Sequence, residues 1–216
     1  GGASVFVTKA AMAETEVKTA ARELKNICVF CGSQPGKDEA YAEAATTLGK
    51  HMAANGIGLV YGGGTVGLMG IIARTVDAEG GPVLGVIPRA LSKREISGEG
   101  VGTVVEVDDM HTRKAKMAEA ADAFIAMPGG FGTFEELFEV ITWQQLGIHS
   151  KPIGCLSVNG YYEPLGALIA HAVKSGFIHE RFLDLVVIDA DPANLVKRLQ
   201  EQRLPEAVIT WEVPAV

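Results

Sequence analysis

The feature that most constrains the fold is an alternation of short apolar runs with longer stretches that have the length of helices. The apolar runs are Ile27–Phe30, Gly58–Tyr61, Val83–Ile87, Thr103–Val107, Ala123–Met127, Ile153–Val158 and Leu185–Asp189. The stretches of helical length are Asp38–Ala54, Leu68–Ala78, Thr112–Ala121, Thr133–Leu146, Pro164–Ser175 and Pro192–Gln202. Apolar strands that alternate with helices are typical of a parallel sheet covered by helices on both faces. The pattern contains no internal repeat and no linker. It predicts an α/β fold, a single Rossmann-like domain built on one doubly wound parallel sheet.

The same pattern sets the expected limits of the domain. We expect it to span residues 26–202, between a flexible N-terminal tail at 1–25 and a C-terminal tail at 203–216. Within the first tail, the stretch AETEVKTAARELK is polar, and no signal-peptide core is present. No apolar run in the chain approaches the roughly 20 residues that span a bilayer. The sequence therefore predicts a soluble, cytoplasmic protein that does not enter a membrane.

Charge and cysteine content argue against two classes of function. The net charge is −7, so a nucleic-acid surface is not expected, because phosphate backbones attract basic patches. Cys28 and Cys31 form a lone C-x-x-C, a spacing also used for metal or redox sites. In a strand, however, these side chains point to opposite faces and lie about 10 Å apart. No second C-x-x-C is present to complete a zinc site. We therefore expect no metal, and three free thiols suit a reducing compartment.

Three glycine-bearing loops each follow a predicted strand and precede a predicted helix. They are Cys31–Gly36, Tyr61–Gly70 and Met127–Glu136. In open α/β sheets, ligands bind beyond the carboxyl ends of the strands. Glycines let backbone N–H groups approach an anion, and the N-terminus of the following helix adds positive potential. Glycine also serves ordinary turns, but several loops of this kind in one chain favour a site for a phosphate.

The second loop also fits the pattern of a dinucleotide-binding dehydrogenase. Gly62, Gly64 and Gly67 match G-x-G-x-x-G. That site needs an acidic residue at the end of the next strand, where it binds the ribose hydroxyls. The next strand instead ends in Val86-Ile87-Pro88-Arg89. The sequence therefore disfavours a dehydrogenase.

Several longer motifs follow one another along the chain: FCGSQPG, LVYGGGTVGLMG, GVIPRAL, DMHTRKAKM, PGGFGTFEE and ITWQQLGIH. In this order they resemble the LONELY GUY family of cytokinin-activating phosphoribohydrolases, and the resemblance extends from Asn26 to about Leu199. Its hallmark, PGGxGTxxE, stands here at Pro128–Glu136. The resemblance implies hydrolysis of a cytokinin riboside 5′-monophosphate to free base and ribose 5-phosphate, without a metal or organic cofactor. Some relatives carry an older label of lysine decarboxylase, but the sequence shows no signature of a pyridoxal site.

Glu136 is the candidate catalytic carboxylate. Cleavage of a ribosyl N-glycosidic bond builds positive charge at C1′, which a nearby carboxylate can stabilise. A structural alternative exists, because Thr133 and Glu136 match the T-x-x-E capping box of a helix N-terminus. Phe134, Leu137, Phe138 and Ile141 share one helical face, with Glu136 nearly opposite. The resemblance favours the catalytic role.

Arg113 is the second candidate catalytic residue. With Lys114 and Lys116 it also fits a solvated helix face. Its helix follows a predicted strand and so begins at the carboxyl edge of the sheet, where a guanidinium can hold a phosphate or pair with Glu136. The resemblance implies that Arg113 is catalytic and that Lys114 contacts the substrate.

The remaining candidate substrate contacts come from the resemblance and the glycine loops: Ser33, Gly63, Gly64, Glu95, Gly129, Gly130, Gly132, Thr133, Glu135 and Thr142. For Glu95 the alternative is an exposed loop residue, and for Thr142 a packed helix residue. Val140 and Trp143 lie away from the main apolar face of their helix, which suggests that a second partner covers them. We therefore expect a homodimer. Two functional alternatives remain: a hydrolase of AMP or another nucleoside monophosphate, and a non-catalytic nucleotide-binding carrier.

Overall fold

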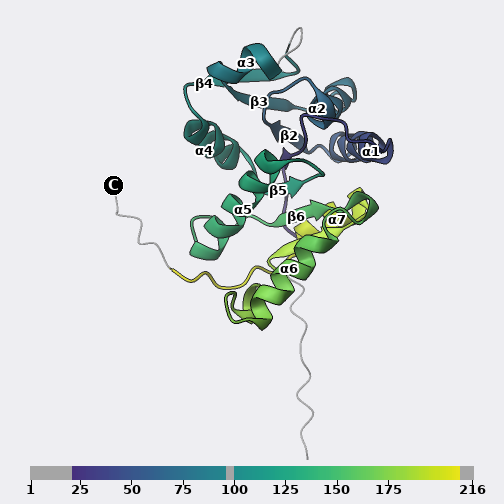
Figure 1. Cartoon of the computed structure of the whole chain (residues 1–216). Coiled ribbons are helices and arrows are strands. Elements are labelled where there is room, and N and C mark those ends of the chain that lie inside the picture. Colours follow the sequence, from purple (N-terminus) through teal and green to yellow (C-terminus); the bar gives the residue numbers. More distant parts are fainter. Residues whose placement is uncertain (1–20, 96–99, 210–216) are drawn as a thin grey trace, which may run out of the picture.

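The computed structural model describes residues 21–95 and 100–209 (Figure 1). Its centre is a seven-stranded parallel sheet with the order β4-β3-β2-β1-β5-β6-β7. The strands are β1 (Asn26–Phe30), β2 (Gly58–Tyr61), β3 (Val83–Pro88), β4 (Thr103–Val107), β5 (Ala123–Ala126), β6 (Ile153–Leu156) and β7 (Val186–Asp189). The predicted doubly wound α/β fold is confirmed.

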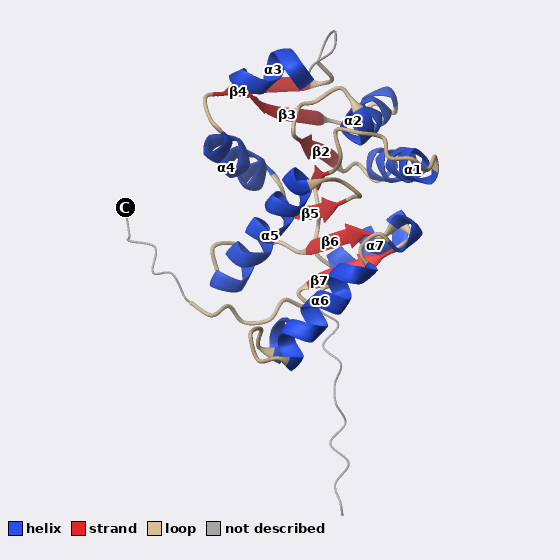
Figure 2. Ribbon diagram, viewed as in Figure 1, coloured by secondary structure: helices blue, strands red, loops and turns tan. Residues whose placement is uncertain are grey.

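Helices cover both faces of this sheet (Figure 2). They are α1 (Ala40–Ala54), α2 (Gly67–Ala78), α3 (Arg89–Glu95), α4 (Met110–Ala120), α5 (Phe131–Leu146), α6 (Glu163–Lys174) and α7 (Pro192–Glu201), with short 3₁₀ turns at Val158–Gly160 and Glu180–Phe182. Residues from α1, α2 and α7 pack into one core cluster, and residues from α4 and α5 pack into the other. Among the described residues, no helix is long and apolar enough to cross a membrane.

The central strand β1 shows why the apolar runs are continuous. Ile27 and Val29 belong to the core on one side of the sheet, whereas Cys28 and Phe30 belong to the core on the other. Because parallel strands in this fold are buried on both faces, every position needs an apolar side chain. Cys28 and Cys31 accordingly lie in different clusters, as predicted, and both are free thiols. The described residues contain no cluster of potential metal ligands.

The structure differs from the sequence-based expectation at several boundaries. Helix α3 was not predicted, because it directly follows β3 and its residues show no apolar periodicity. The packed domain also begins before Asn26, since Leu24 is buried and the Arg22 N–H donates to the Gln200 carbonyl at 2.9 Å. Beyond α7, the Val208 N–H donates to the Gln145 carbonyl of α5 at 2.9 Å. The described parts of both expected tails therefore contact the domain.

The strand order places the loops that matter for function. Strand β1 pairs with β2 on one side and with β5 on the other, so the connections leave in opposite directions at this point. Such a switch point opens a crevice beyond the carboxyl ends of the two strands, where ligands of doubly wound proteins bind. The loops that follow β1 and β5 meet there, and the Gly32 N–H donates to the Pro128 carbonyl at 3.1 Å.

Candidate active site

The N-terminus of α5 carries the hallmark motif, and its geometry excludes the capping-box alternative. The helix starts at Phe131 with Gly130 as its N-cap, in an extended conformation, and among the described residues no side chain caps it. Thr133 is the third residue of the helix and is buried, so it cannot be the cap. Glu136 therefore lies in the second turn, beyond the position from which a capping box reaches back. Gly130 supplies no side-chain acceptor to the first N–H groups of α5, which suits an anion.

Arg113 is held in the first turns of α4. Asp109 caps this helix, accepting hydrogen bonds from the Thr112 N–H at 2.8 Å and the Thr112 hydroxyl at 2.9 Å, and these bonds lower the pKa of Asp109. Arg113 is only 7% exposed. Its Nε donates to the Val86 carbonyl at 3.1 Å and its Nη2 to the Gly62 carbonyl at 3.2 Å. The solvated-face alternative is therefore wrong for Arg113.

The buried guanidinium faces Glu136. Arg113 Nη1 lies 3.9 Å from Glu136 Oε1, and the two side chains are 8% and 12% exposed. Of the two options for Arg113, a phosphate contact or a pair with Glu136, the structure contains the pair. Charges withdrawn from solvent are screened less and interact more strongly than surface charges. The arrangement places a carboxylate and a fixed cation beside the N-terminus of α5.

Lys114 takes part in a separate cluster with α5. Its Nζ lies 2.6 Å from Glu135 Oε1 and 2.9 Å from Glu139 Oε1. Partial burial alone would lower the pKa of Lys114, but the hydrogen bonds to the two carboxylates outweigh that effect and raise it. Lys114 thus links α4 to α5 through two carboxylates that precede and follow Glu136 in the sequence.

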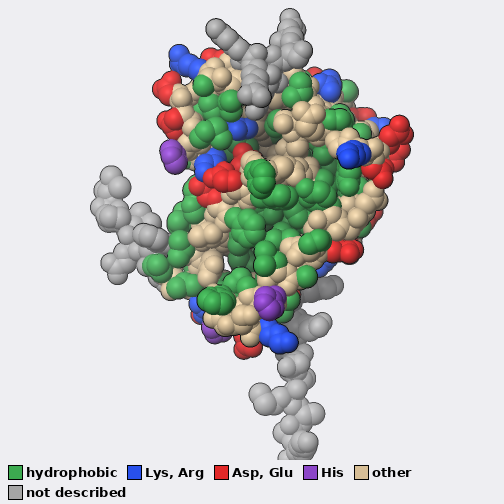
Figure 3. Space-filling model, viewed as in Figure 1, with side chains coloured by type: hydrophobic (Ala, Val, Ile, Leu, Met, Phe, Trp, Pro, Cys, Tyr) green, Lys and Arg blue, Asp and Glu red, His purple; other side chains and the backbone are tan. Residues whose placement is uncertain are grey.

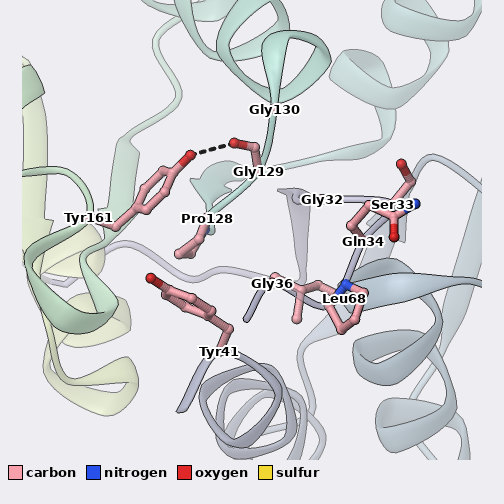
Figure 4. A pocket seen from close by; sticks show the side chains of 11 residues that line it. Gly32, Ser33, Gln34, Gly36, Tyr41, Leu68, Pro128, Gly129, Gly130 and Tyr161 are labelled. Carbon is pink, nitrogen blue, oxygen red and sulfur yellow. Dashed lines mark hydrogen bonds between the residues drawn. The ribbon is translucent and has the colours of Figure 1, made fainter. Parts of the chain in front are cut away.

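A cavity of about 330 Å³ lies at the switch point, between the loops that follow β1 and β5 (Figure 4). Its lining comprises Gly32, Ser33, Gln34, Pro35, Gly36, Tyr41, Leu68, Pro128, Gly129, Gly130 and Tyr161. The rings of Tyr41 and Tyr161 meet edge to face, with centroids 6.3 Å apart. The cavity reaches the N-terminus of α5 through Gly129 and Gly130. A Cβ at Gly130 or Gly132 would meet nothing within 4 Å, so the approach to the first turn of α5 is open.

Two glycines of the second loop, Gly62 and Gly67, are required by packing. A Cβ at Gly62 would collide with the Arg113 guanidinium, and Gly67 has a φ of +57° and packs against the backbone of Ser33. Only glycine meets both requirements without strain. Gly63 and Gly64 do not belong to the lining of the cavity. Two of the three glycines of the G-x-G-x-x-G match, Gly62 and Gly67, therefore allow close packing around Arg113 and the first loop.

The structure brings together some of the remaining candidates and separates others. Ser33, Gly129 and Gly130 line the cavity, and Thr133 is buried beneath Gly129. Thr142 lies farther along α5, is exposed, and donates from Oγ1 to the Phe138 carbonyl at 2.7 Å. Glu95 is the last residue of α3, and its side chain lies outside what the structure describes.

Three residues that contact the candidate site were not predicted: Tyr41, Tyr161 and Tyr162. Tyr162 is buried and its hydroxyl donates to the Met127 carbonyl at 2.8 Å. The adjacent Tyr161 hydroxyl donates to the Gly129 carbonyl at 2.5 Å. The sequence did offer one signal for Tyr161 and Tyr162. They directly follow Asn159-Gly160, a turn sequence that comes after a buried strand.

Sequence comparisons find related proteins over most of this chain. The sequence model of the family described as "Possible lysine decarboxylase" matches residues 69–199. The "Probable cytokinin riboside 5′-monophosphate phosphoribohydrolase LOGL2" of Oryza sativa subsp. japonica is 54% identical over 177 residues, 82% of this chain and 72% of that protein. The "Cytokinin riboside 5′-monophosphate phosphoribohydrolase LOG7" of Arabidopsis thaliana is 55% identical over 82% of each chain.

Among solved structures, the molybdenum cofactor carrier protein of Chlamydomonas reinhardtii aligns with a TM-score of 0.61. The alignment covers 83% of this chain and all of that one, at 21% identity. A second structure, of a molybdenum cofactor binding protein from Rippkaea orientalis, gives a TM-score of 0.58 at 21% identity, over 81% of this chain and 94% of that one. At these identities the likeness concerns the fold alone.

Proposed function

This chain belongs to the LONELY GUY family, and we propose that it hydrolyses cytokinin riboside 5′-monophosphates to the free N6-substituted adenine and ribose 5-phosphate. It is thus a hydrolase of N-glycosyl bonds. The observation that carries the proposal is the largely buried pair of Arg113 and Glu136 beside the uncapped N-terminus of α5. A nucleotide-binding carrier needs an anion site, whereas it has no use for a carboxylate fixed next to it.

The 5′-phosphate binds at the N-terminus of α5 in this proposal. Gly129, Gly130, Gly132 and Thr133 form or adjoin that end of the helix, and Ser33 of the first loop lines the cavity that reaches it. Glu136 stands five residues after Phe131, which corresponds to about 7.5 Å along the helix axis. Side chains of a helix tilt toward its N-terminus, so the carboxylate lies closer to the phosphate site than its Cα. That spacing suits a nucleotide whose C1′ lies beside Glu136.

Glu136 acts on the anomeric carbon. As the bond to the base breaks, positive charge develops on C1′ and the ring oxygen, and the carboxylate stabilises it. Arg113 fixes the position of that carboxylate, because it is itself anchored to the carbonyls of Val86 and Gly62. Binding of the distant phosphate contributes to the orientation of the sugar. The ion pairs of Lys114 hold α4 and α5 at the distance that this arrangement requires.

The apolar surface over α5 and α6 supports a homodimer. Hydrophobic side chains gather across the middle of the face shown in Figure 3, where these two helices lie. Phe138 of α5 is 44% exposed and Leu168 of α6 is 57% exposed, and α6 contributes no buried side chain. Val140, expected at the interface, is instead buried in the core with Leu137, so that part of the expectation is wrong. A large apolar patch on one helix pair fits a second copy of itself.

A cytoplasmic location is part of the same proposal. The three cysteines are buried and free in the structure. Reducing compartments keep thiols in this state. Secretion with formation of a disulfide among these cysteines would contradict it.

The test measures release of free base from three substrates: isopentenyladenosine 5′-monophosphate, AMP and the unphosphorylated riboside. We expect release from the first, little from the riboside, and a loss of about 10³-fold in kcat/KM for Glu136→Gln. Glu119→Gln is the matched control, because this exposed carboxylate lies on α4 away from the pair. Preference for AMP would support the same reaction but would show that the enzyme does not select for an N6 substituent. Nucleotide binding without release of base from any substrate would identify a carrier and refute the proposal.

A further inference from the structure

Three successive backbone carbonyls of the loop between β5 and α5 each accept a hydrogen bond from another part of the chain. The Met127 carbonyl accepts from the Tyr162 hydroxyl at 2.8 Å, and the Pro128 carbonyl accepts from the Gly32 N–H at 3.1 Å. The Gly129 carbonyl accepts from the Tyr161 hydroxyl at 2.5 Å, the bond drawn in Figure 4. The donors come from the loops that follow β1 and β6. All three carbonyls are therefore already engaged by hydrogen bonds within the protein.

This arrangement fixes the direction of the N–H groups. In a planar trans peptide, the C=O and the following N–H point to opposite sides. The bond between Tyr161 and the Gly129 carbonyl therefore aims the Gly130 N–H away from Tyr161. In the same way, the bond between Gly32 and the Pro128 carbonyl aims the Gly129 N–H away from Gly32. These two N–H groups immediately precede those of the first turn of α5, where backbone N–H groups can bind an anion.

We propose that Tyr161 is a positioning residue for the 5′-phosphate, acting through the peptide that joins Gly129 and Gly130. This inference rests on the proposed function, because it assigns a role at the same site. The peptide lies between two glycines, which have no Cβ and therefore oppose its rotation less than other residues do. A hydrogen bond to its carbonyl is thus a direct way to keep the N–H directed at the ligand.

The role of Tyr161 can be tested cleanly because its ring packs against other side chains, whereas its hydroxyl makes the hydrogen bond to the loop. The ring is half-buried and packs against Tyr41, Phe134 and Tyr162, with centroids 6.3, 6.4 and 5.1 Å away. Tyr161→Phe keeps these contacts and removes only the donor. Tyr162, in contrast, is 2% exposed, and its substitution would combine loss of a hydrogen bond with a change in the core.

The experiment compares Tyr161→Phe with Tyr61→Phe. The Tyr61 hydroxyl is buried and has no hydrogen-bond partner among the described residues, so the control removes the same group without a bond. Titration calorimetry gives Kd for AMP and for adenosine, and base release gives kcat and KM for the monophosphate. For Tyr161→Phe we expect affinity for AMP to fall about fivefold to tenfold, the factor that one hydrogen bond corresponds to. Affinity for adenosine should stay the same, and the rise in KM should exceed the fall in kcat.

Two outcomes would overturn the inference. One is unchanged binding of AMP by Tyr161→Phe. The other is an equal loss of affinity for AMP and adenosine together with a lower Tm, which would indicate a merely structural role. Failure of the proposed function gives a different result, because the unmodified protein would then release no base. The binding comparison between AMP and adenosine would still decide the role of Tyr161.

Discussion

Replacing Arg113 by methionine removes a buried guanidinium whose contribution to stability can be worked from its contacts. Arg113 Nη1 lies 3.9 Å from Glu136 Oε1, and both side chains are largely buried. At an effective dielectric constant of about 20, two charges at this separation attract by about 4 kcal/mol. The two hydrogen bonds to the carbonyls of Val86 and Gly62 add about 1.5–3 kcal/mol each. The cost of keeping the charges out of water offsets a large part of this sum.

The expected net loss in the free energy of unfolding is about 3–5 kcal/mol for Arg113→Met. For a chain of this size, that loss lowers Tm by roughly 10 °C. The assay is urea denaturation at a fixed protein concentration. Arg89→Met is the matched control, because Arg89 lies closer to its partner, 3.4 Å from Asp108, but this pair is 70% and 86% exposed. An exposed pair contributes less than about 1 kcal/mol, so burial rather than distance should decide the difference.

A double-mutant cycle with Glu136→Gln isolates the pair itself. The loss in the free energy of unfolding of the double variant should be about 2–3 kcal/mol smaller than the sum of the losses of the two single variants. The coupling should also persist at high salt, because buried charges are poorly screened. If Arg113→Met costs no more than Arg89→Met, or if the two substitutions are additive within about 0.5 kcal/mol, the reasoning from burial is wrong.

Two further predictions concern the far end of α5 and its outer face. Burial lowers the pKa of His149 to about 4, although its bond to the Val140 carbonyl acts in the opposite direction. Because the unfolded chain takes up this proton more readily, the free energy of unfolding is at its full value above the ordinary pKa of about 6.5 and decreases as the pH falls toward 4. Urea denaturation should show a loss of about 1–2 kcal/mol between pH 7 and pH 5 that His149→Gln reduces, and an equal pH dependence in both proteins would contradict the assignment. Phe138→Glu, placed on the exposed apolar face of α5, should shift sedimentation from dimer to monomer with little change in Tm, whereas Glu119→Gln should leave the dimer intact; a monomeric parent protein would refute the dimer.

The strands and most helices could be predicted because their signals are local. A strand of a parallel sheet that is buried on both faces is apolar at nearly every position, and β1 and β5 show this directly. The start of α5 was misplaced for an equally local reason. Thr133 and Glu136 carry the letters of a capping box, whereas the actual N-cap, Gly130, has no side chain that could indicate its role.

The parts of the site that were missed depend on contacts between distant segments. Tyr161 and Tyr162 bond to carbonyls 32 and 35 residues earlier in the chain, and no spacing in the sequence reports such a bond. The prediction of which face of α5 is buried was incomplete for a related reason. Helical periodicity indicated apolar residues on two faces, but it could not show that Leu137 and Val140 face the sheet while Phe138 faces outward.

The position of β1 at the centre of the sheet also has a kinetic consequence. Its partner β5 begins almost a hundred positions later, and Asp122 just before β5 accepts hydrogen bonds from the N–H groups of Lys25 and Asn26. Pairing of this kind joins segments far apart in the sequence, and such non-local contacts slow folding because the loop between them must close first. The crevice that holds the glycine loops exists only after this step. A folding intermediate with β1 to β4 in place would have half of the anion site and no Glu136 beside it. Recovery of base release during refolding should therefore lag behind the recovery of helical structure.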